Sequence, residues 1–523
     1  MSAFRIRRSY VILAALCVAC GLACARAVAA SDDAPGEAAA APTDPAVPPV
    51  LTLRECILRA LAANKDIRIA DVQVDISEAA ITGAEGAFDL TVFAEASAGR
   101  TEVPVAGVPL DRVRTRDSDV VVGLRKRLVT GTDVSMAASN AYSRDLTGRS
   151  ALNPLYGPEV TLGISQDLLK DFGVDINRTH IVLAANNHLA SLEDRRQSIM
   201  ANLLEVEQVY WELYYATADL AVREQQRARA ESLVRVATRR EQVGPGTKKD
   251  ISRAEASAAA QSVAILNAEN RVQQLRHRLL RLMGVLDELS ADVEFSLGEL
   301  PPYEPQQTSL AEAMAVARRF RPDYRQAELA IDNAELRSRF ARNQTLPRLQ
   351  AFVSYSLLGL DDSLSGGIDH VRDADYDSWR AGLRFEVPFP NRTARSEQRV
   401  AALERRIAAL RRDAALETIT RDVADALQNL QTAEGRIESA RRARELARDL
   451  LNKETRAYEV GDSDSTDVLD AQAALANAER DEVGARTDYV TALAALWAAQ
   501  GDLLERKGIS LVEQGTSSGA DGR

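Results

Sequence analysis

Residues 455–503 read TRAYEVGDSDSTDVLDAQAALANAERDEVGARTDYVTALAALWAAQGDL, which describes the end of one helix, a turn opened by Gly461 and a second helix. Residues 238–286 read TRREQVGPGTKKDISRAEASAAAQSVAILNAENRVQQLRHRLLRLMGVL. A shift of 217 positions aligns the two stretches without a gap, so that Gly244 falls on Gly461. An internal repeat of this length constrains every other interpretation of the chain. We therefore expect two tandem copies of one long antiparallel helical hairpin.

The long helix before each turn carries an apolar seven-residue repeat. These helices, predicted over residues 181–243 and 396–460, would each be about 90 Å long at the helical rise. Return helices are expected over 250–283 and 467–500. Sustained heptads indicate helices that supercoil against partners, and helices this long must pack on each other or on other subunits. The repeated apolar positions are Val206, Leu213, Leu220 and Val234 in the first copy and Val423, Leu430, Ile437 and Leu451 in the second.

Composition and charge exclude several classes of function. The 523 residues carry a formal net charge of −11, whereas nucleic-acid binding requires a basic face. The four histidines form neither an HExxH motif nor a Cys-His zinc pattern. We therefore predict no nucleic-acid partner, no cofactor, no metal and no enzymatic activity.

The first 30 residues have the pattern of a secretory signal. Three arginines within the first eight residues precede an apolar core over 10–23. A lipoprotein start at Cys24 is an alternative. Cleavage after residue 30 would leave Cys56 as the only cysteine, at a position where a buried small residue is expected. Residues 31–50 are rich in Ala and Pro and are predicted to be a disordered tether, and no later segment is long and apolar enough for a transmembrane helix.

Between the helices the hydrophobic period changes from 3.6 to 2. Four alternating runs lie within about 88–168 and two within about 349–389. Such runs indicate strands with one apolar and one polar face. A soluble sandwich and a membrane barrel both give this pattern, but the leader and the aromatic residues near the run ends favour a barrel. The polar, glycine-rich segments 101–117, 144–158 and 359–377 are predicted to be loops.

These elements divide the chain into two repeats, 51–286 and 308–504, joined by a connector over 287–307. Residues 505–523 are expected to form a flexible tail. The outer two strand runs of the first repeat match the two runs of the second. The middle hairpin, about 118–143, has no counterpart and is predicted to be inserted.

From about residue 51 to 504 the chain resembles the TolC-like outer membrane factors. The most specific part is Tyr458-Glu459-Val460-Gly461 followed by Ser465-Thr466-Asp467-Val468-Leu469-Asp470-Ala471-Gln472, and Arg321-Pro322-Asp323 and Leu346-Pro347 also fit. The resemblance implies a mainly α fold, in which a long coiled-coil α-helical barrel continues into a transmembrane β-barrel shared by a homotrimer. It also implies the outer membrane of a Gram-negative bacterium, with the helical tube in the periplasm.

By this resemblance the protein would be the outer membrane channel of a tripartite efflux pump or a type I secretion system. Its partners would be outer-membrane lipid, a periplasmic adaptor and an inner-membrane transporter. The alternative from another class is a periplasmic coiled-coil scaffold or adaptor without a pore. The family pattern has four strands per chain and twelve per barrel. The six runs of this chain predict eighteen, unless the extra hairpin folds over the mouth.

The resemblance also assigns roles to residues at the hairpin tips. Asp467 and Asp470 match the aspartates that ring the closed aperture, and Asp250 stands at the matching place in the first copy. A ring of carboxylates would attract cations and make closure sensitive to pH and salt. The alternative role for Asp467 is a charge that meets the helix macrodipole. Where the second copy has Asp470, the first has Arg253. The adaptor is expected to dock at Gly244, Thr247, Gly461, Ser465 and Thr466.

Overall fold

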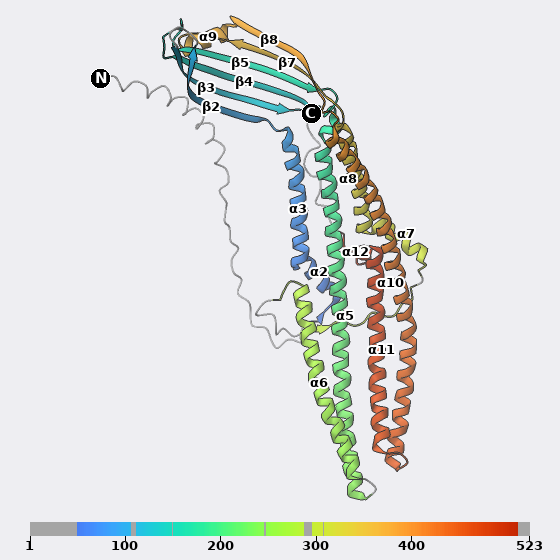
Figure 1. Ribbon diagram of the computed structural model, residues 1–523. Coiled ribbons are helices and arrows are strands. Elements are labelled where there is room, and N and C mark those ends of the chain that lie inside the picture. The colour runs from blue at the N-terminus through green and yellow to red at the C-terminus, as the bar shows by residue number, and fades with distance from the viewer. Residues whose placement is uncertain are drawn as a thin grey trace, which may run out of the picture. The chain divides into compact units, whose positions relative to one another are not determined.

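The computed structural model describes residues 50–105, 111–148, 150–244, 247–286, 295–306 and 308–510. The predicted signal sequence, the lipidation alternative at Cys24 and most of the predicted tether lie outside the described residues. The same holds for positions 287–294 of the connector and for 511–523 of the tail. Residues from Val50 onward belong to one compact unit, in which a layer of helices carries a sheet at one end (Figure 1).

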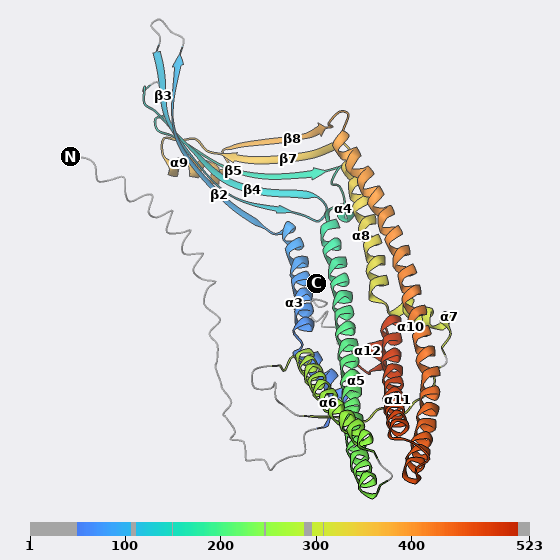
Figure 2. The ribbon, with the colours of Figure 1, turned by 60° about the horizontal axis from the view of Figure 1, so that its bottom comes forward.

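The helices form a single layer in which two very long helices run the full height (Figures 1 and 2). Toward the tips the order across the layer is α6, α5, α11, α10, and near the sheet it is α3, α5, α8, α10. The two hairpins match the predicted boundaries to within four residues. The bounds are α3 Lys65–Glu85, α5 Thr179–Val243, α6 Lys248–Leu282, α8 Pro322–Gln344, α10 Arg392–Val460 and α11 Ser465–Gln500.

The apolar heptad positions lie where the helices contact each other. Val206 and Leu213 on α5 are buried, and so are the matching Val423 and Leu430 on α10. The largest apolar cluster surrounds Tyr210, where α5 meets the short helices. The minor helices are α2 Leu53–Ala63, α4 Val174–Asn177, α7 Leu310–Phe320, α12 Leu503–Arg506 and the 3-10 turn Gly86–Phe88.

Ordered residues occur in all three segments that we predicted to be a disordered tether, a connector and a flexible tail. Strand β1 (Val50–Leu51), at the end of the predicted tether, pairs in parallel with β6 (Ser296–Leu297) of the predicted connector. The Tyr210 hydroxyl donates to the Leu51 carbonyl at 3.1 Å and accepts from the Gly298 N–H at 2.9 Å. In the predicted tail, Lys507 Nζ lies 2.8 Å from the carboxylate of buried Glu207.

Matched residues of the two repeats have matched environments. Gly284 follows α6 with φ +70°, and Gly501 follows α11 with φ +78°. A Cβ at Gly284 would lie 2.2 Å from the Ala63 carbonyl oxygen, and one at Gly501 would lie 2.7 Å from the Phe320 carbonyl. Each glycine therefore lets a return helix end against the corner of a preceding helix pair.

Cys56 is fully buried in α2, as expected for a small apolar position, and its repeat counterpart Ala313 is fully buried in α7. Burial raises the pKa of the Cys56 thiol to about 12. Because the thiolate is the reactive form, this cysteine is inert at neutral pH.

Six strands form one antiparallel sheet in the order β2, β3, β4, β5, β7, β8. The hairpin without a counterpart, β3–β4, is therefore part of the sheet and does not fold over its end. None of the described helices is both long enough and apolar enough to span a bilayer. The strand bounds are β2 Thr91–Val105, β3 Asp111–Arg127, β4 Thr132–Asp145, β5 Leu155–Asp167, β7 Arg348–Leu358 and β8 Tyr376–Glu386.

Two of the predicted loops are wrong in large part. In 101–117 the ladder of β2 and β3 continues, and Glu102 lies 2.9 Å from Arg112 and 3.2 Å from Arg114 across it. Cross-strand ion pairs can stabilise a sheet even where apolar and polar residues do not alternate. This extension of the ladder therefore has no period-2 pattern in the sequence. Segment 359–377 contains helix α9 (Leu364–Asp373), which packs on β5. The third loop is shorter than predicted, because β5 begins at Leu155.

Candidate functional site: the two-faced sheet and the paired tips

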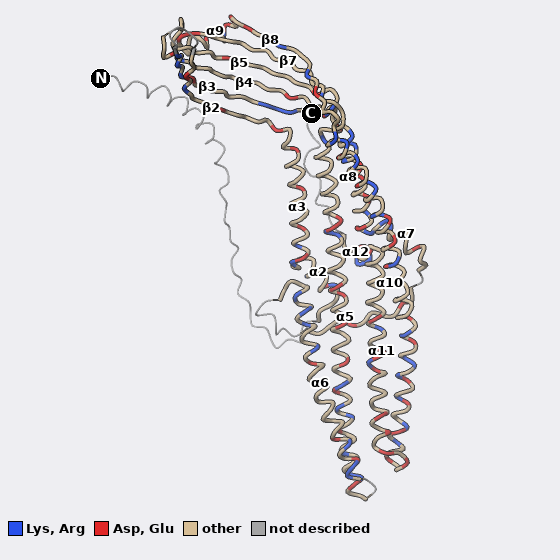
Figure 3. The backbone as a smooth tube through the Cα atoms, in the orientation of Figure 1, with Lys and Arg blue, Asp and Glu red and all other residues tan. Residues whose placement is uncertain are grey.

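The sheet has one apolar and one polar face. Residues paired directly across strands share a face, so the register assigns every side chain. Charged residues are sparse along the middle of the strands and frequent on the helices (Figure 3). The first face carries exposed large apolar residues on all six strands: Val92, Val120, Val122, Leu124, Met136, Leu162, Ile164, Val353, Tyr355, Trp379, Leu383 and Phe385.

The opposite face is polar and hollowed. A depression of about 610 Å³ crosses it from β2 to β7, and most of its lining side chains are polar. Two aromatic rings on this face cover glycines of neighbouring strands, Phe93 over Gly123 and Phe352 over Gly382. An apolar outer face with a polar hollow face is the distribution expected of a barrel wall between lipid and water. The polar residues that line the depression include Thr91, Arg125, Ser135, Ser165 and Ser354.

At the other end of the molecule, glycine ends both long helices. Gly244 has φ +107° and Gly461 has φ +98°, a conformation that glycine adopts without strain. Each return helix then begins with a reciprocal capping box, Thr247 with Asp250 and Asp464 with Asp467. The sequence therefore fixes both turns locally.

The two tips contact each other through the first turns of their return helices. The Ser465 hydroxyl, which is fully buried, donates to the Asp250 carboxylate at 2.7 Å. Burial alone would raise the pKa of Asp250, but hydrogen bonds from Thr247 and Ser465 outweigh it and hold that pKa below its ordinary value. Asp250 therefore links the two hairpins within one chain.

Two arginines of the first hairpin also reach the second. Arg253 Nη1 donates to the Thr466 hydroxyl at 2.6 Å and lies 3.6 Å from the Asp464 carboxylate. The Arg240 guanidinium lies 4.5 Å from the centre of the Tyr458 ring and donates to the Tyr458 carbonyl. Sequence reasoning had noted Arg253 only as a difference from Asp470, and it had missed Arg240.

The residues predicted for the aperture and for docking occupy different environments. Asp467 and Asp470 are exposed. The Asp467 side chain completes its capping box, whereas the Asp470 side chain forms no hydrogen bond or ion pair with the described residues. Of the predicted docking residues, Gly244, Thr247 and Gly461 are exposed, while Ser465 and Thr466 are engaged within the chain. Only part of the predicted docking set is therefore accessible in this conformation.

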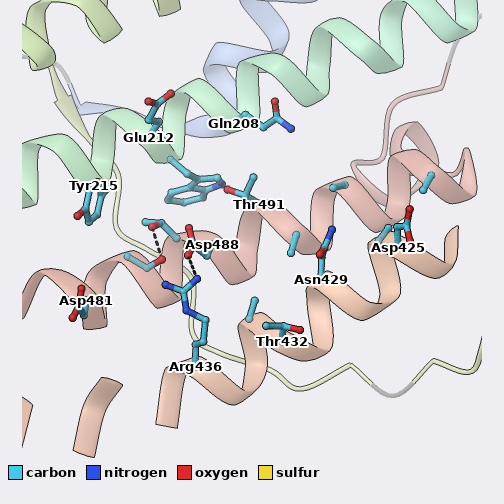
Figure 4. Close-up of a pocket in the computed structure, with 18 of the residues that line it drawn as sticks. Gln208, Glu212, Tyr215, Asp425, Asn429, Thr432, Arg436, Asp481, Asp488 and Thr491 are labelled. Atoms are coloured by element: carbon cyan, nitrogen blue, oxygen red, sulfur yellow. Dashed lines mark hydrogen bonds and ion pairs between the residues drawn. The ribbon is translucent and has the colours of Figure 1, made fainter. Parts of the chain in front are cut away.

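A polar groove of about 990 Å³ runs between α5, α10 and α11 (Figure 4). Arg436 lies 2.7 Å from Asp488 in it, and the groove also contains Glu212, Asp425 and Asp481. Acidic side chains therefore outnumber basic ones on this stretch of the helical layer. The described residues contain no cluster of His, Cys, Asp or Glu that could hold a metal ion.

The sequence matches the family described as outer membrane efflux protein over residues 56–285 and 314–502, which together exceed half of the chain. The chain belongs to this efflux protein family. The two matched segments of the efflux protein correspond closely to the two repeats. The resemblance drawn from the tip motifs is thereby confirmed.

The chain is similar to known efflux proteins and to several solved structures. Outer membrane efflux protein BepC of Brucella suis biovar 1 is 24% identical over 370 residues, covering 70% of this chain and 78% of BepC. Probable efflux pump outer membrane protein TtgC of Pseudomonas putida is 24% identical over 361 residues, covering 68% and 71%. The outer-membrane channel OprN matches with a TM-score of 0.66 at 18% identity, covering 86% of this chain and 90% of OprN. VceC of Vibrio cholerae matches with a TM-score of 0.63 at 19% identity, covering 86% and 96%. The structures show a shared fold, mainly helical with a β domain, which confirms the predicted fold class.

Proposed function

We propose that the protein is the outer membrane exit duct of a tripartite efflux pump or a type I secretion system, and that it works as a homotrimer. The sheet carries this proposal, because its apolar face suits lipid and its hollow polar face suits a water-filled lumen. A six-stranded open sheet cannot lie in lipid with unpaired edges, so several copies must complete the wall. In this arrangement the helical layer lines a periplasmic tube.

The alternative, a periplasmic scaffold or adaptor without a pore, is disfavoured by the same sheet. A soluble scaffold gains nothing from an apolar face that extends over six strands. Cell fractionation followed by planar-bilayer recording separates the two functions. We expect recovery in the outer membrane fraction and discrete channel conductance. Recovery as a soluble periplasmic protein without conductance would refute the duct.

The paired tips are proposed to be the periplasmic aperture and the docking site of an adaptor. Exposed Asp467 and Asp470 are available to form a carboxylate ring near a three-fold axis, while the contacts of Asp250 and Arg253 hold each chain's two hairpins together. Alanine at both Asp467 and Asp470 should raise single-channel conductance or admit large antibiotics into cells. Alanine at Glu241 and Glu459, outside the contacts described, is the matched control. Unchanged conductance and susceptibility would remove the gate assignment.

A crosslink placed at the tips would identify the partners. Photo-crosslinking residues at exposed Val243 and Val460 flank the two glycine turns. We expect them to capture a periplasmic adaptor, whose neighbouring transporter would narrow the exported cargo. A crosslinker at Glu417, which is far from the tips on α10, serves as the control position.

A further inference from the structure

We infer that the exit barrel is built from eighteen strands, closed by pairing β8 of one copy with β2 of the next, with Glu95 held between two arginines at each seam. This inference rests on the proposed channel function and specifies the wall of that channel. The family pattern stated above implies twelve strands. The observations that carry the larger number are the edges, the faces and the register of the sheet.

Both edges of the sheet are open and have suitable directions. Every residue of β8 except Gly382 is exposed, and β2 is exposed along its described side chains except at Phe93. Because six antiparallel strands are an even number, β2 and β8 run in opposite directions. An antiparallel β8–β2 seam therefore continues the pattern of the sheet from copy to copy. A head-to-tail contact of this kind closes into a ring when the rotation between copies completes a full turn, as it does for three copies around a three-fold axis.

The two edges complement each other on both faces. On the apolar face, β8 carries the large residues Trp379, Leu383 and Phe385, whereas β2 carries Val92 followed by the small residues Ala94, Ala96 and Ala98. Large residues on one strand can thus cover small ones on its neighbour.

On the polar face, β8 carries Arg380 and Arg384, and β2 carries Glu95. Glu95 forms no ion pair with the described residues of its own chain. The Arg384 guanidinium lies 5.7 Å from the centre of the Phe352 ring of its own chain, and the Arg384 side chain is exposed. The edge charges are therefore opposite in sign and solvent-accessible, and pairs of opposite charge stabilise neighbouring strands.

The register within the chain predicts the register across the seam. A hydrogen-bonded row passes from Thr91 on β2 through β3, β4, β5 and β7 to Arg380 on β8. Arg380 lies six residues before Glu386, the end of β8 nearest the helices. If Glu386 pairs with Thr91 of the next copy, the strands shift by six residues along their length for every six strands crossed. With the usual rise per residue and spacing between strands, this shift tilts the strands by about 35° from the barrel axis, within the range of membrane barrels.

The neighbouring registers fit less well. A shift of one residue would place apolar side chains on the polar face. A shift of two toward the helices would pair Thr91 with Pro388, which has no N–H to donate. A shift of two in the other direction would pair Thr91 with Arg384 and lower the strand tilt to about 25°, below the range of membrane barrels. With Glu386 opposite Thr91, Gly382 lies opposite Glu95, so Arg380 and Arg384 bracket the Glu95 carboxylate.

The helices below the seam have matching apolar edges. Ile69, Val72 and Ile76 of α3 are exposed on the side of the helix opposite its buried Ile67. On α10, exposed apolar residues lie opposite the face that packs on α8 and α11. They begin eight residues below the sheet end of α10, close to the depth of Ile76 on α3, and they comprise Val400, Leu403, Ile407 and Leu410. The same two edges that meet in the sheet can therefore meet as a coiled-coil seam.

The hairpin β3–β4 makes the wall wide. Its exposed apolar residues Val122, Leu124 and Met136 continue the apolar face of the outer strands. It therefore belongs in the lipid wall. Because barrel diameter grows roughly linearly with strand number, eighteen strands give an outlet about half as wide again as twelve.

One test asks whether the hairpin faces lipid. A fluorophore on Met136→Cys, in a Cys56→Ala background, should be quenched by brominated lipid in proteoliposomes. The same fluorophore on Ala137→Cys, on the polar face, should be quenched at least three-fold less and should respond to aqueous iodide. Equal exposure of both positions to water would overturn the eighteen-stranded wall.

A second test asks how the seam pairs. Thr91→Cys with Glu386→Cys should give disulfide-linked dimers and trimers on a non-reducing gel. Thr91→Cys with Ser378→Cys, displaced by eight residues on the same face of β8, should not. Glu95→Arg should lower the melting temperature of the detergent-resistant trimer, and adding Arg380→Glu and Arg384→Glu should restore it. Failure of these pairs in a trimer that still conducts would refute the seam and leave the channel function intact, whereas a soluble monomer would refute both.

Discussion

The two repeats of this chain agree in their helices and differ in their strands. Gly284 and Gly501 each lie against the backbone of a preceding helix pair, and the capping boxes of Asp250 and Asp467 occupy matched positions. The first repeat contributes four strands to the main sheet and the second contributes two. One half of a duplicated unit has therefore gained a hairpin that the other half lacks.

This difference follows from how each layer is packed. Within one chain, α5 contacts helices on both of its sides and α10 contacts helices on one side. The return helices α6 and α11 end against backbone at Gly284 and Gly501, so added side chains are excluded at those two corners. A sheet lengthens more easily, because an inserted antiparallel hairpin leaves both outer edges with their original directions. Packing in the helical layer thus keeps the helices of the two repeats alike, while the sheet allows the two repeats to differ in the number of strands.

Removing the β3–β4 hairpin should make the two repeats equal in their number of strands. Joining residue 105 to residue 155 deletes β3 and β4 and leaves four strands per chain. Because the lumen area scales roughly with the square of strand number, we expect single-channel conductance to fall to about half. Both proteins are compared with Asp467→Ala and Asp470→Ala, so that the proposed aperture does not limit the current. The far-UV circular dichroism of the helices should be unchanged. An unaltered conductance would mean that the hairpin does not contribute to the wall.

The matched glycines test the shared helical corners. Gly284→Ala combines a positive φ with a 2.2 Å clash against backbone, and we expect a loss of about 3 kcal/mol in the free energy of unfolding. Gly501→Ala should lower the free energy of unfolding somewhat less, because its Cβ would lie 2.7 Å from the Phe320 carbonyl. The control is Gly244→Ala, which has φ +107° but no described atom within 4 Å, and it should cost about 1 kcal/mol. Urea unfolding followed by circular dichroism measures all three, and equal losses would show that close approach is unimportant.

Local signals made much of this architecture predictable. The hairpins were predictable because heptads and glycine turns are encoded within a few residues of the features they determine. The six strands were predictable because each has one apolar face. At the tips, the two glycine turns were predicted, whereas the capping box of Thr247 with Asp250 was missed, although its three-residue spacing is visible in the sequence.

The features that could not be predicted depend on contacts between residues far apart in the sequence. The β1–β6 pair joins segments about 245 residues apart and contains only two residues on each side. Helix α9 interrupts a glycine-rich segment, where Gly359 and Gly367 allow close packing that composition does not reveal. Arg240 resembles any other arginine on an exposed helix until the second tip places Tyr458 beside it. Such contacts have no periodic pattern from which to infer them.

The smallest predicted effect separates the two tip aspartates. Asp250 and Asp467 both cap a helix, but only Asp250 also accepts a hydrogen bond from the other hairpin, through Ser465. Nitroxides on Val243→Cys and Val460→Cys report the separation of the hairpins. Asp250→Ala should broaden the distance distribution between them, while Asp467→Ala should leave it nearly unchanged and cost only about 1 kcal/mol of helix capping.

The same labels test the pH dependence of the tip contact. The pKa of Asp250 is lowered by its hydrogen bonds, so the stability it contributes is complete above the ordinary aspartate value of 3.8 and is lost as pH falls through the lowered value. In detergent, the nitroxide distances should therefore stay narrow from pH 7 to pH 4 and broaden only below that. Asp250→Ala should already be broader than the wild-type chain at pH 7 and should change less as the pH falls, because only the contact between Arg253 and Asp464 then remains to be lost. Broadening near pH 6 in the wild-type chain would assign the pH response to a group other than Asp250, and the asymmetry between the two tips would then require another explanation.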